Sequence, residues 1–283
     1  MQRAFAHCET LVRAADRDRF LATLFAPPGR RGALFALYAF NLEIARVREV
    51  VREPVSGEIR LQWWTDLLCG AGRGEVESHP VVSALLATVA RYGLPPQRLQ
   101  SIVEARRFDL YDEPMATLAD LEAYADGASA NLIALAVQIL SGDDGAGLGA
   151  LCHHAACAHA IAGLLKAFPF HAARGQLFVP IELLDRYGAD RQDVMAGRTT
   201  PQLRSALADL RGCARRHLRH AQDLADTAPP AVLPALLPMA LVGPTLARME
   251  RRGYDPFVPV EIAPWRRQWL IWRAARRPGR IFR

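Results

Sequence analysis

The fold is decided by the stretch Leu37-Tyr38-Ala39-Phe40-Asn41-Leu42-Glu43-Ile44-Ala45-Arg46-Val47-Arg48-Glu49. Its apolar residues recur at spacings of three and four, which is the period of a helix and not of a strand. Tyr38, Asn41 and Ala45 lie on one face of that helix, since residues three and four apart share a face. We expect this face to look inward, either into a cavity or, for Tyr38, into a packed core where its hydroxyl is hydrogen-bonded.

The same helical period continues along almost the whole chain, and stretches with the alternation of a strand are rare. The sequence therefore predicts an all-α protein. Thr117 ahead of Asp120 is typical of a helix cap, and Thr200 ahead of Pro201 is typical of a cap with a first-position proline. The expected helices span residues 8–25, 30–51, 56–71, 79–91, 96–111, 118–141, 147–168, 180–187, 201–226, 230–250 and 258–276.

The composition is that of a folded protein with a basic tail. Of the 283 residues, 51% are hydrophobic and 23% are charged, which excludes a disordered chain. The formal net charge is +6, from 35 Lys and Arg against 29 Asp and Glu. Residues 265–283 hold seven of these arginines and no acid, which leaves 28 basic and 29 acidic residues, a net charge of −1, for residues 1–264. The excess charge therefore does not predict a nucleic-acid partner.

The chain has the features of a cytoplasmic protein. Its five cysteines are odd in number and lack CxxC spacing, which favours a reducing compartment. The N-terminus has acidic residues early and no apolar segment typical of a signal peptide. The longest apolar run, Val232 to Val242, is interrupted by Pro234 and Pro238 and is too short to span a membrane.

Several landmarks follow the opening stretch in a fixed order. They are Asp109-Leu110, then Asp120-Leu121-Glu122-Ala123-Tyr124, then the run from Leu165 to Pro180. In this order and spacing, residues 15–250 resemble the squalene/phytoene synthase family. The resemblance implies a single helical bundle of the isoprenoid-synthase type with a central cavity. We assign residues 1–264 to this synthase-like domain and residues 265–283 to a basic tail rich in Trp and Arg.

In that family two helices each carry an aspartate motif, and acids four residues apart point together at Mg²⁺, which neutralises a departing diphosphate. The resemblance places the acidic positions of the first motif on Ala45, Arg46 and Glu49, so one carboxylate remains. Those of the second motif fall on Ala167 and His171. Because Mg²⁺ prefers oxygen ligands, we expect no catalytic residue, metal or cofactor at these positions.

One branch of the family has this same loss. Residues 35–51, 60–64, 102–112 and 165–180 are similar to the mitochondrial complex I assembly factor six type, which is considered to lack synthase activity. The resemblance implies a non-catalytic assembly factor whose partner is a subunit or assembly intermediate of respiratory complex I. Two alternatives stay open. One is a Mg²⁺-dependent head-to-head prenyltransferase that makes phytoene or presqualene diphosphate. The other is a binder of a prenyl lipid, a prenyl diphosphate or a quinone.

The candidate cavity-lining residues come from these landmarks and from the helix faces. Several of them also have a plain structural explanation. Glu49 beside Arg46 is typical of a solvated ion pair, Asp109 could be a surface charge, and His171 could be a hydrogen-bonded structural histidine. The candidates are Tyr38, Asn41, Ala45, Glu49, Asp109, Tyr124, Ala167 and His171.

A group of possible ligands lies on one predicted helix. His153, His154, Cys157 and His159 have spacings seen among metal ligands, but no single face of the helix collects all four. We therefore expect them to pack within an alanine-rich helix and predict no metal site. No phosphate-binding glycine loop or Ser-His-Asp order points to another chemistry.

The tail begins with tryptophans at a helical spacing. Trp265, Trp269 and Trp272 stand at i, i+4 and i+7 and form one stripe. Indoles flanked by arginines are typical of a helix that lies on an anionic membrane, here the inner face of the cytoplasmic membrane. Alternatively, the tryptophans dock on the bundle and the arginines stay solvated. The candidate contacts to a membrane or an anion are Arg266, Arg267, Trp269, Trp272 and Arg273.

Overall fold

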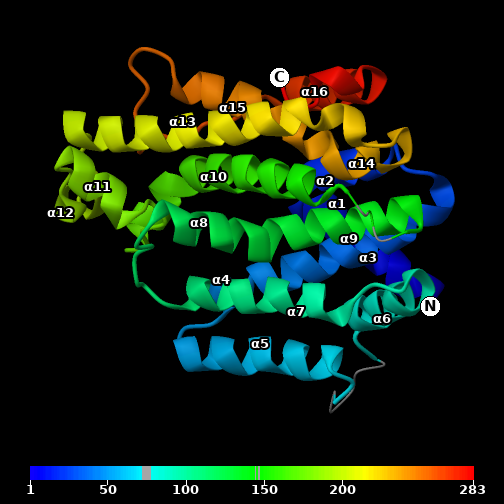
Figure 1. The fold of residues 1–283 in the computed structure, drawn as a ribbon. Coiled ribbons are helices and arrows are strands. Elements are labelled where there is room, and N and C mark those ends of the chain that lie inside the picture. Colours follow the sequence, from blue (N-terminus) through cyan, green and yellow to red (C-terminus); the bar gives the residue numbers. More distant parts are fainter. Residues whose placement is uncertain (72–77, 144, 146) are drawn as a thin grey trace.

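The described residues of the computed structural model, 1–71, 78–143, 145 and 147–283, form helices and no strand (Figure 1), which confirms the predicted all-α class. The α-helices are α1 (Gln2–Ala15), α2 (Arg17–Thr23), α3 (Pro28–Ala45), α4 (Val47–Val50), α5 (Pro54–Leu68), α6 (Pro80–Tyr92), α7 (Pro96–Ala105), α8 (Leu118–Ala125), α9 (Asn131–Ser141), α10 (Gly149–Ala173), α11 (Ile181–Tyr187), α12 (Arg191–Met195), α13 (Pro201–Asp223), α14 (Leu233–Leu236), α15 (Val242–Met249) and α16 (Pro264–Arg276). The main irregular turns are a 3-10 turn at Arg106–Leu110, a π-helical turn at Asp126–Ala130 and a 3-10 turn at Leu237–Leu241.

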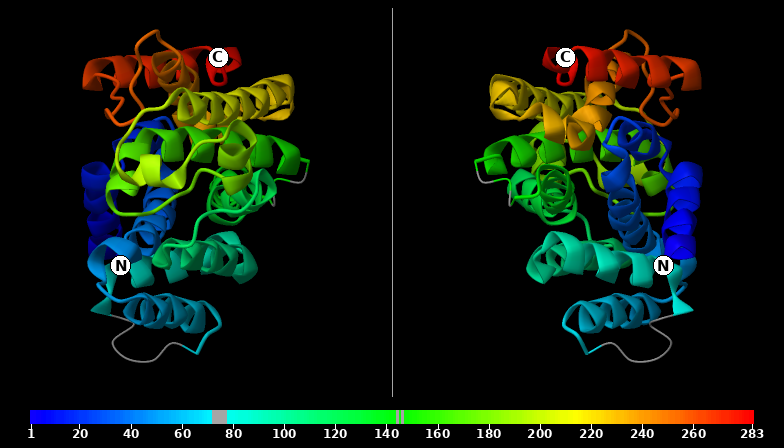
Figure 2. Two further views of the ribbon diagram at one scale, coloured as in Figure 1. Left: turned by 90° about the vertical axis from the view of Figure 1, so that its left-hand side faces the viewer. Right: turned by 90° about the vertical axis from the view of Figure 1, so that its right-hand side faces the viewer.

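The helices stack from one edge of the molecule to the other. In Figure 1 the order runs from α5 at the bottom through α6 and α7, then α8 and α9, then α10 and α13, to α15 and α16 at the top. The turned views in Figure 2 place α1 on one flank beside α3, and these two helices pack against each other. The longest helix, α10, packs along α13.

The core lies around the two helices that are most apolar on all sides. In α9 nearly every residue from Leu132 to Leu140 is buried, and in α10 the run Ala155 to Ala158 is buried with the apolar residues that follow it. Helices of this kind belong at the centre of a bundle, as the sequence predicts. Two helical stretches, Leu118–Ser141 and Pro230–Met249, are long and apolar enough to cross a membrane, but half or more of each is buried within the protein.

Both predicted caps are confirmed. The Thr117 hydroxyl accepts a hydrogen bond from the Asp120 backbone N–H at 3.1 Å, and the Asp120 carboxylate accepts one from the Thr117 backbone N–H at 2.9 Å. Thr200 accepts a hydrogen bond from the Leu203 backbone N–H at 3.1 Å, and Pro201 is the first residue of α13. These caps satisfy N–H groups that a helix start leaves without a partner.

Some helix boundaries differ from the prediction. The segment 8–25 is two helices, because the Asp16 carboxylate accepts a hydrogen bond from the Arg19 backbone N–H at 3.0 Å and starts α2. The helix expected to end at residue 168 continues through Pro169. A proline inside a helix costs a hydrogen bond, but its neighbours Phe168 and Ala172 are buried, and this burial holds the last turn in place.

The end of the chain packs onto the bundle. Helix α16 contacts α2 and the Leu237–Leu241 turn, and its Ile271 and Ala274 are buried. Ile281 and Phe282 are buried as well. Gly243 in α15 lets the chain end approach closely, since a Cβ at this position would lie 2.8 Å from the Arg283 carbonyl oxygen. The boundary drawn between residues 264 and 265 therefore falls at the start of a helix that is docked on the bundle.

Candidate functional site

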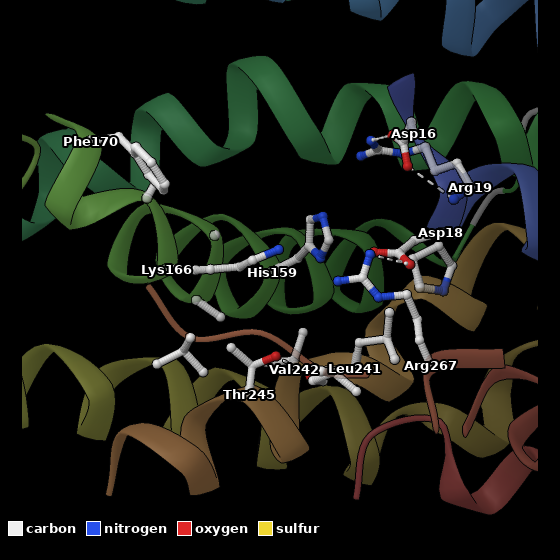
Figure 3. Close-up of a pocket in the computed structure, with 16 residues that line it drawn as sticks. Asp16, Asp18, Arg19, His159, Lys166, Phe170, Leu241, Val242, Thr245 and Arg267 are labelled. Carbon is white, nitrogen blue, oxygen red and sulfur yellow. Dashed lines mark hydrogen bonds and ion pairs between the residues drawn. The ribbon is translucent and has the colours of Figure 1, made fainter. Parts of the chain in front are cut away.

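A pocket of about 430 Å³ lies between α2, α10, α15 and the segment that leads into α16 (Figure 3). One part of its wall is apolar and includes Ala162, Leu241 and Ile262. Charged side chains gather in the other part, at Asp16, Asp18, Arg19, Lys166 and Arg267, together with His159. A mostly apolar pocket with a few converging polar groups is the usual form of a small-molecule site.

The first ion pair of the pocket forms at the start of α2. Arg19 Nη1 donates to Asp16 Oδ2 at 2.5 Å, and the Arg19 guanidinium lies 5.6 Å from the centre of the Tyr38 ring. Burial would raise the pKa of the Asp16 carboxyl, but the charge and hydrogen bonds of Arg19 outweigh it and hold this pKa below its usual value. Asp16 is therefore ionised at neutral pH and fixes the position of Arg19.

A second ion pair joins α2 to α16. Arg267 Nη1 lies 3.2 Å from Asp18 Oδ1, and the two side chains are 21% and 25% exposed. Burial raises the pKa of the Asp18 carboxyl by more than Arg267 lowers it. Arg267, a candidate contact to a membrane or an anion, points into the pocket and not outward with the tail tryptophans, because Asp18 lies beneath that face of α16.

Helix α10 supplies the remaining polar groups. Lys166, the one lysine of the chain, extends along the pocket toward His159 in Figure 3. Burial and the nearby charge of Arg19 lower the pKa of His159 to about 4, so its ring is neutral at neutral pH. Even when both aspartates are ionised, three cationic side chains face two carboxylates. The charged end of the pocket therefore has a net positive charge that suits an anionic group.

The eight candidate cavity residues do not gather in this pocket. Of the eight, Ala167 lines the pocket, and Tyr124 lines another hollow beside Phe108 and Pro114. Tyr38 and Asn41 are buried in the core of the bundle. Ala45 is partly buried at the end of α3. Glu49 is half-exposed, and its carboxylate lies 4.0 Å from Arg46 Nε, as in a solvated ion pair.

Asp109 and Tyr124 meet in a buried polar network. The Tyr124 hydroxyl donates to Asp109 Oδ1 at 2.9 Å, and Arg106 Nη1 donates to Asp109 Oδ2 at 3.0 Å and to the Tyr124 hydroxyl at 2.5 Å. Asp109 is buried, so it is not a surface charge. The His171 ring lies 4.6 Å from the Phe178 ring, and burial lowers the pKa of His171. This network ties the turn after α7 to α8.

The residues at the aspartate-motif positions do not fit Mg²⁺. Ala45 and Ala167 offer no ligand, and the one carboxylate, that of Glu49, is paired with Arg46. The pocket aspartates, Asp16 and Asp18, are each engaged by an arginine. Mg²⁺ needs several oxygen ligands in near-octahedral geometry, which these side chains do not provide. We therefore derive no chemical step through a metal at this site.

The tryptophan stripe of α16 points away from the bundle. Trp265, Trp269 and Trp272 are 71%, 45% and 49% exposed, respectively. Arg273 lies over the Trp269 ring at 4.9 Å, and Arg276 lies over the Trp272 ring at 5.6 Å. Arg266 is exposed on the same helix. The alternative in which the tryptophans dock on the bundle is therefore wrong, since Ile271 and Ala274 make the contact instead.

The pocket could be found from the sequence only in part. Asp16-Arg17-Asp18-Arg19 is an unusual alternation of charge, and Lys166 is the one lysine among 35 basic residues. The charge alternation and the single lysine both indicate a charged site. No local pattern, however, brings Arg267 to Asp18, because Arg267 comes 249 positions after Asp18 in the sequence. Their ion pair depends on how α16 docks.

Comparisons with known proteins agree with this fold. A family model described as squalene/phytoene synthase matches residues 12–273. The NADH dehydrogenase (ubiquinone) complex I assembly factor 6 of Homo sapiens is 29% identical over 255 residues, covering 89% of this chain and 76% of that protein. A presqualene diphosphate synthase of Sinorhizobium fredii is 25% identical over 238 residues, covering 82% of each. The crystal structure of a squalene synthase from Alicyclobacillus acidocaldarius superposes with a TM-score of 0.75 at 23% identity, covering 90% of this chain and 95% of that one, and shows the shared fold.

Proposed function

This chain belongs to the squalene/phytoene synthase family, and we propose that within the family it is a non-catalytic assembly factor for respiratory complex I. The observation that carries the proposal is a retained bundle in which Ala45, Arg46, Ala167 and His171 stand at the aspartate-motif positions. The likeness to complex I assembly factor 6 over 89% of the chain supports the same role. The partner would be a subunit or an assembly intermediate of complex I.

The chemistry of the pocket supports binding and not prenyl coupling. Ionisation of an allylic diphosphate in an apolar pocket depends on cations that neutralise the departing group. Arg19, Lys166 and Arg267 can hold an anion by charge and hydrogen bonds. With Glu49 as the one carboxylate at the motif positions, the site lacks the metal cluster that gives the strongest support for departure of the leaving group. The retained pocket is thus a binding site in a scaffold that has lost its reaction.

One observation favours a second role, the binding of a prenyl lipid, a prenyl diphosphate or a quinone. The pocket joins an apolar wall to a cationic end, and its volume of about 430 Å³ is within the range of small-molecule sites. An isoprenoid tail would lie along Ala162, Leu241 and Ile262, with an anionic or polar head toward Lys166. Such a ligand would not require a metal.

Helix α16 supports attachment to a membrane surface. Its three exposed indoles form a stripe on one face, and the arginines of the tail can contact anionic headgroups. We propose that the protein is cytoplasmic and attaches to the inner face of the cytoplasmic membrane. In this arrangement the mouth of the pocket lies next to the docking helix, because Arg267 of α16 lines the pocket.

Incubation of the purified chain with farnesyl and geranylgeranyl diphosphate and Mg²⁺, followed by analysis of hydrocarbon products, tests the non-catalytic assignment. An active presqualene or phytoene synthase run in parallel shows that the assay detects coupling. We expect no coupled product from this chain. Metal-dependent formation of presqualene diphosphate or phytoene would overturn the proposal and establish the prenyltransferase alternative.

A further inference from the structure

A cluster of metal-binding side chains lies away from the pocket, where α10 runs between α8 and α13 (Figure 1). Each of these helical segments contributes a pair of residues four apart, which share a helix face. We call this group the histidine cluster. The pairs are Glu122 and Asp126, His153 and Cys157, and Cys213 and His217; His154 belongs to the cluster as well, and the exposed His220 lies beside it. Four of the eight histidines of the chain are therefore at one place.

The cluster could not be recognised from one helix. His153, His154 and Cys157 face α8 and α13, whereas His159 on the same helix lines the pocket of Figure 3. We expected no metal site because His153, His154, Cys157 and His159 do not share one face of α10, and this is correct for α10 alone. The expectation does not include the possible ligands that α8 and α13 add. His217 arrives from α13, 63 positions after His154.

Three ring nitrogens converge at the centre of the cluster. The Nδ1 atoms of His154 and His217 lie 3.0 Å apart, and one ligand atom from each of His153, His154 and His217 lies within 4.8 Å of the other two. Zinc–nitrogen bonds of 2.0–2.1 Å in a tetrahedron place ligand nitrogens about 3.3 Å apart. Small side-chain movements would bring the three rings to that spacing.

Carboxylates hold two of these rings in the way that metal-binding histidines are usually held. Glu122 Oε1 lies 3.2 Å from His217 Nε2, and Asp126 Oδ1 lies 2.7 Å from His153 Nδ1. A carboxylate that accepts from one ring nitrogen directs the other nitrogen at a metal and raises its basicity. Asp126 begins the π-helical turn between α8 and α9, and such turns are frequent at functional sites.

The rings are available to an ion. His153 and His154 are partly exposed, so the cluster can be reached from solvent. The Nδ1 atoms of His154 and His217 face each other, so both nitrogens can turn toward an ion placed between them.

We propose that His153, His154 and His217 bind a divalent late first-row transition-metal ion, Zn²⁺ foremost, with Glu122 and Asp126 orienting two of the rings. Three histidines leave a fourth position for water or for a partner side chain. The ion would link α10 to α13 and does not depend on the proposed assembly role. Imidazole selects Zn²⁺ and its neighbours over Mg²⁺, which favours oxygen ligands.

The test uses the full chain without a histidine tag, stripped with a chelator and titrated with Zn²⁺ by calorimetry in competition with a chelator of known affinity. We expect one Zn²⁺ per chain and a loss of affinity of at least about 100-fold in His154→Gln and in His217→Gln. His7→Gln, which changes an exposed histidine of α1, is the matched control and should bind as the wild type does. Co²⁺ should give the visible absorption of a tetrahedral site in the wild type and in this control alone.

A second variant keeps the test informative if the ligand variants fail to fold. Glu122→Gln preserves size and should weaken Zn²⁺ binding by about 10- to 100-fold, since it removes the carboxylate that orients His217. Circular dichroism confirms that each variant is folded before titration. The proposal is overturned if the wild type and His154→Gln bind Zn²⁺ with the same affinity. It is also overturned if Mg²⁺ at the same concentration as Zn²⁺ displaces the bound Zn²⁺.

Discussion

Replacement of Tyr124 by Phe removes one hydroxyl from the buried network and nothing else. That hydroxyl donates to Asp109 Oδ1 at 2.9 Å and accepts from Arg106 Nη1 at 2.5 Å. Each lost hydrogen bond involves a charged group and costs about 1.5–3 kcal/mol when the partner is buried. The ion pair between Arg106 and Asp109 at 3.0 Å remains and limits the loss. We therefore expect the free energy of unfolding to fall by about 2–4 kcal/mol.

Urea denaturation followed by circular dichroism at pH 7 measures this change. Tyr111→Phe is the matched control, because the Tyr111 hydroxyl contacts Glu58 at 3.0 Å on an exposed surface. Its denaturation midpoint should coincide with that of the wild type. Equal midpoints for Tyr124→Phe and the wild type would refute the view that the network is a tightly paired support of the α7–α8 region.

Three other outcomes are expected. Trp269→Ala should weaken binding to anionic vesicles about tenfold in co-sedimentation, because an indole that is 45% exposed could no longer enter the interface; unchanged binding would contradict membrane docking by α16. The pKa of His159 is lowered to about 4 from 6.5 by burial and Arg19, so between these values the unfolded chain binds a proton that the folded chain does not. The free energy of unfolding should then fall by up to about 3 kcal/mol as the pH drops through this window, and denaturation at several pH values should show His159→Gln without that fall. Gly243→Ala should lower stability by about 1–3 kcal/mol because its Cβ would lie 2.8 Å from the Arg283 carbonyl oxygen, whereas Gly163→Ala, with open space at its Cβ in α10, should raise it by about 1 kcal/mol; thermal melts with equal shifts would disprove this reasoning.

The sequence predicts what is local along the chain. Helical periodicity and the caps at Thr117 and Thr200 depend on residues within a few positions, and the structure has them as expected. The central place of α9 follows from its apolar residues on every side. Local sequence preferences fail where burial of neighbouring side chains stabilises a different conformation. Pro169 remains inside α10, where Phe168 and Ala172 are buried, and the positions of the prolines alone do not predict this burial.

The candidate site depends on contacts between distant segments. Asp16 and Asp18 gain their roles from Arg19 and from Arg267, and the second of these pairs forms only when α16 docks on α2. The histidine cluster likewise needs α13 to bring His217 to α10. Periodicity shows which residues share a helix face but not which helices meet. For this reason the charged end of the pocket and the histidine cluster were not predicted.

The most direct test of the assembly role is the amount of active complex I in cells that lack this gene. Deletion should lower NADH:ubiquinone oxidoreductase activity and the amount of fully assembled complex, and the wild-type gene should restore both. Succinate-driven respiration, which bypasses complex I, serves as the control and should not change. Normal levels of assembled, active complex I in the deletion strain would contradict the proposed function.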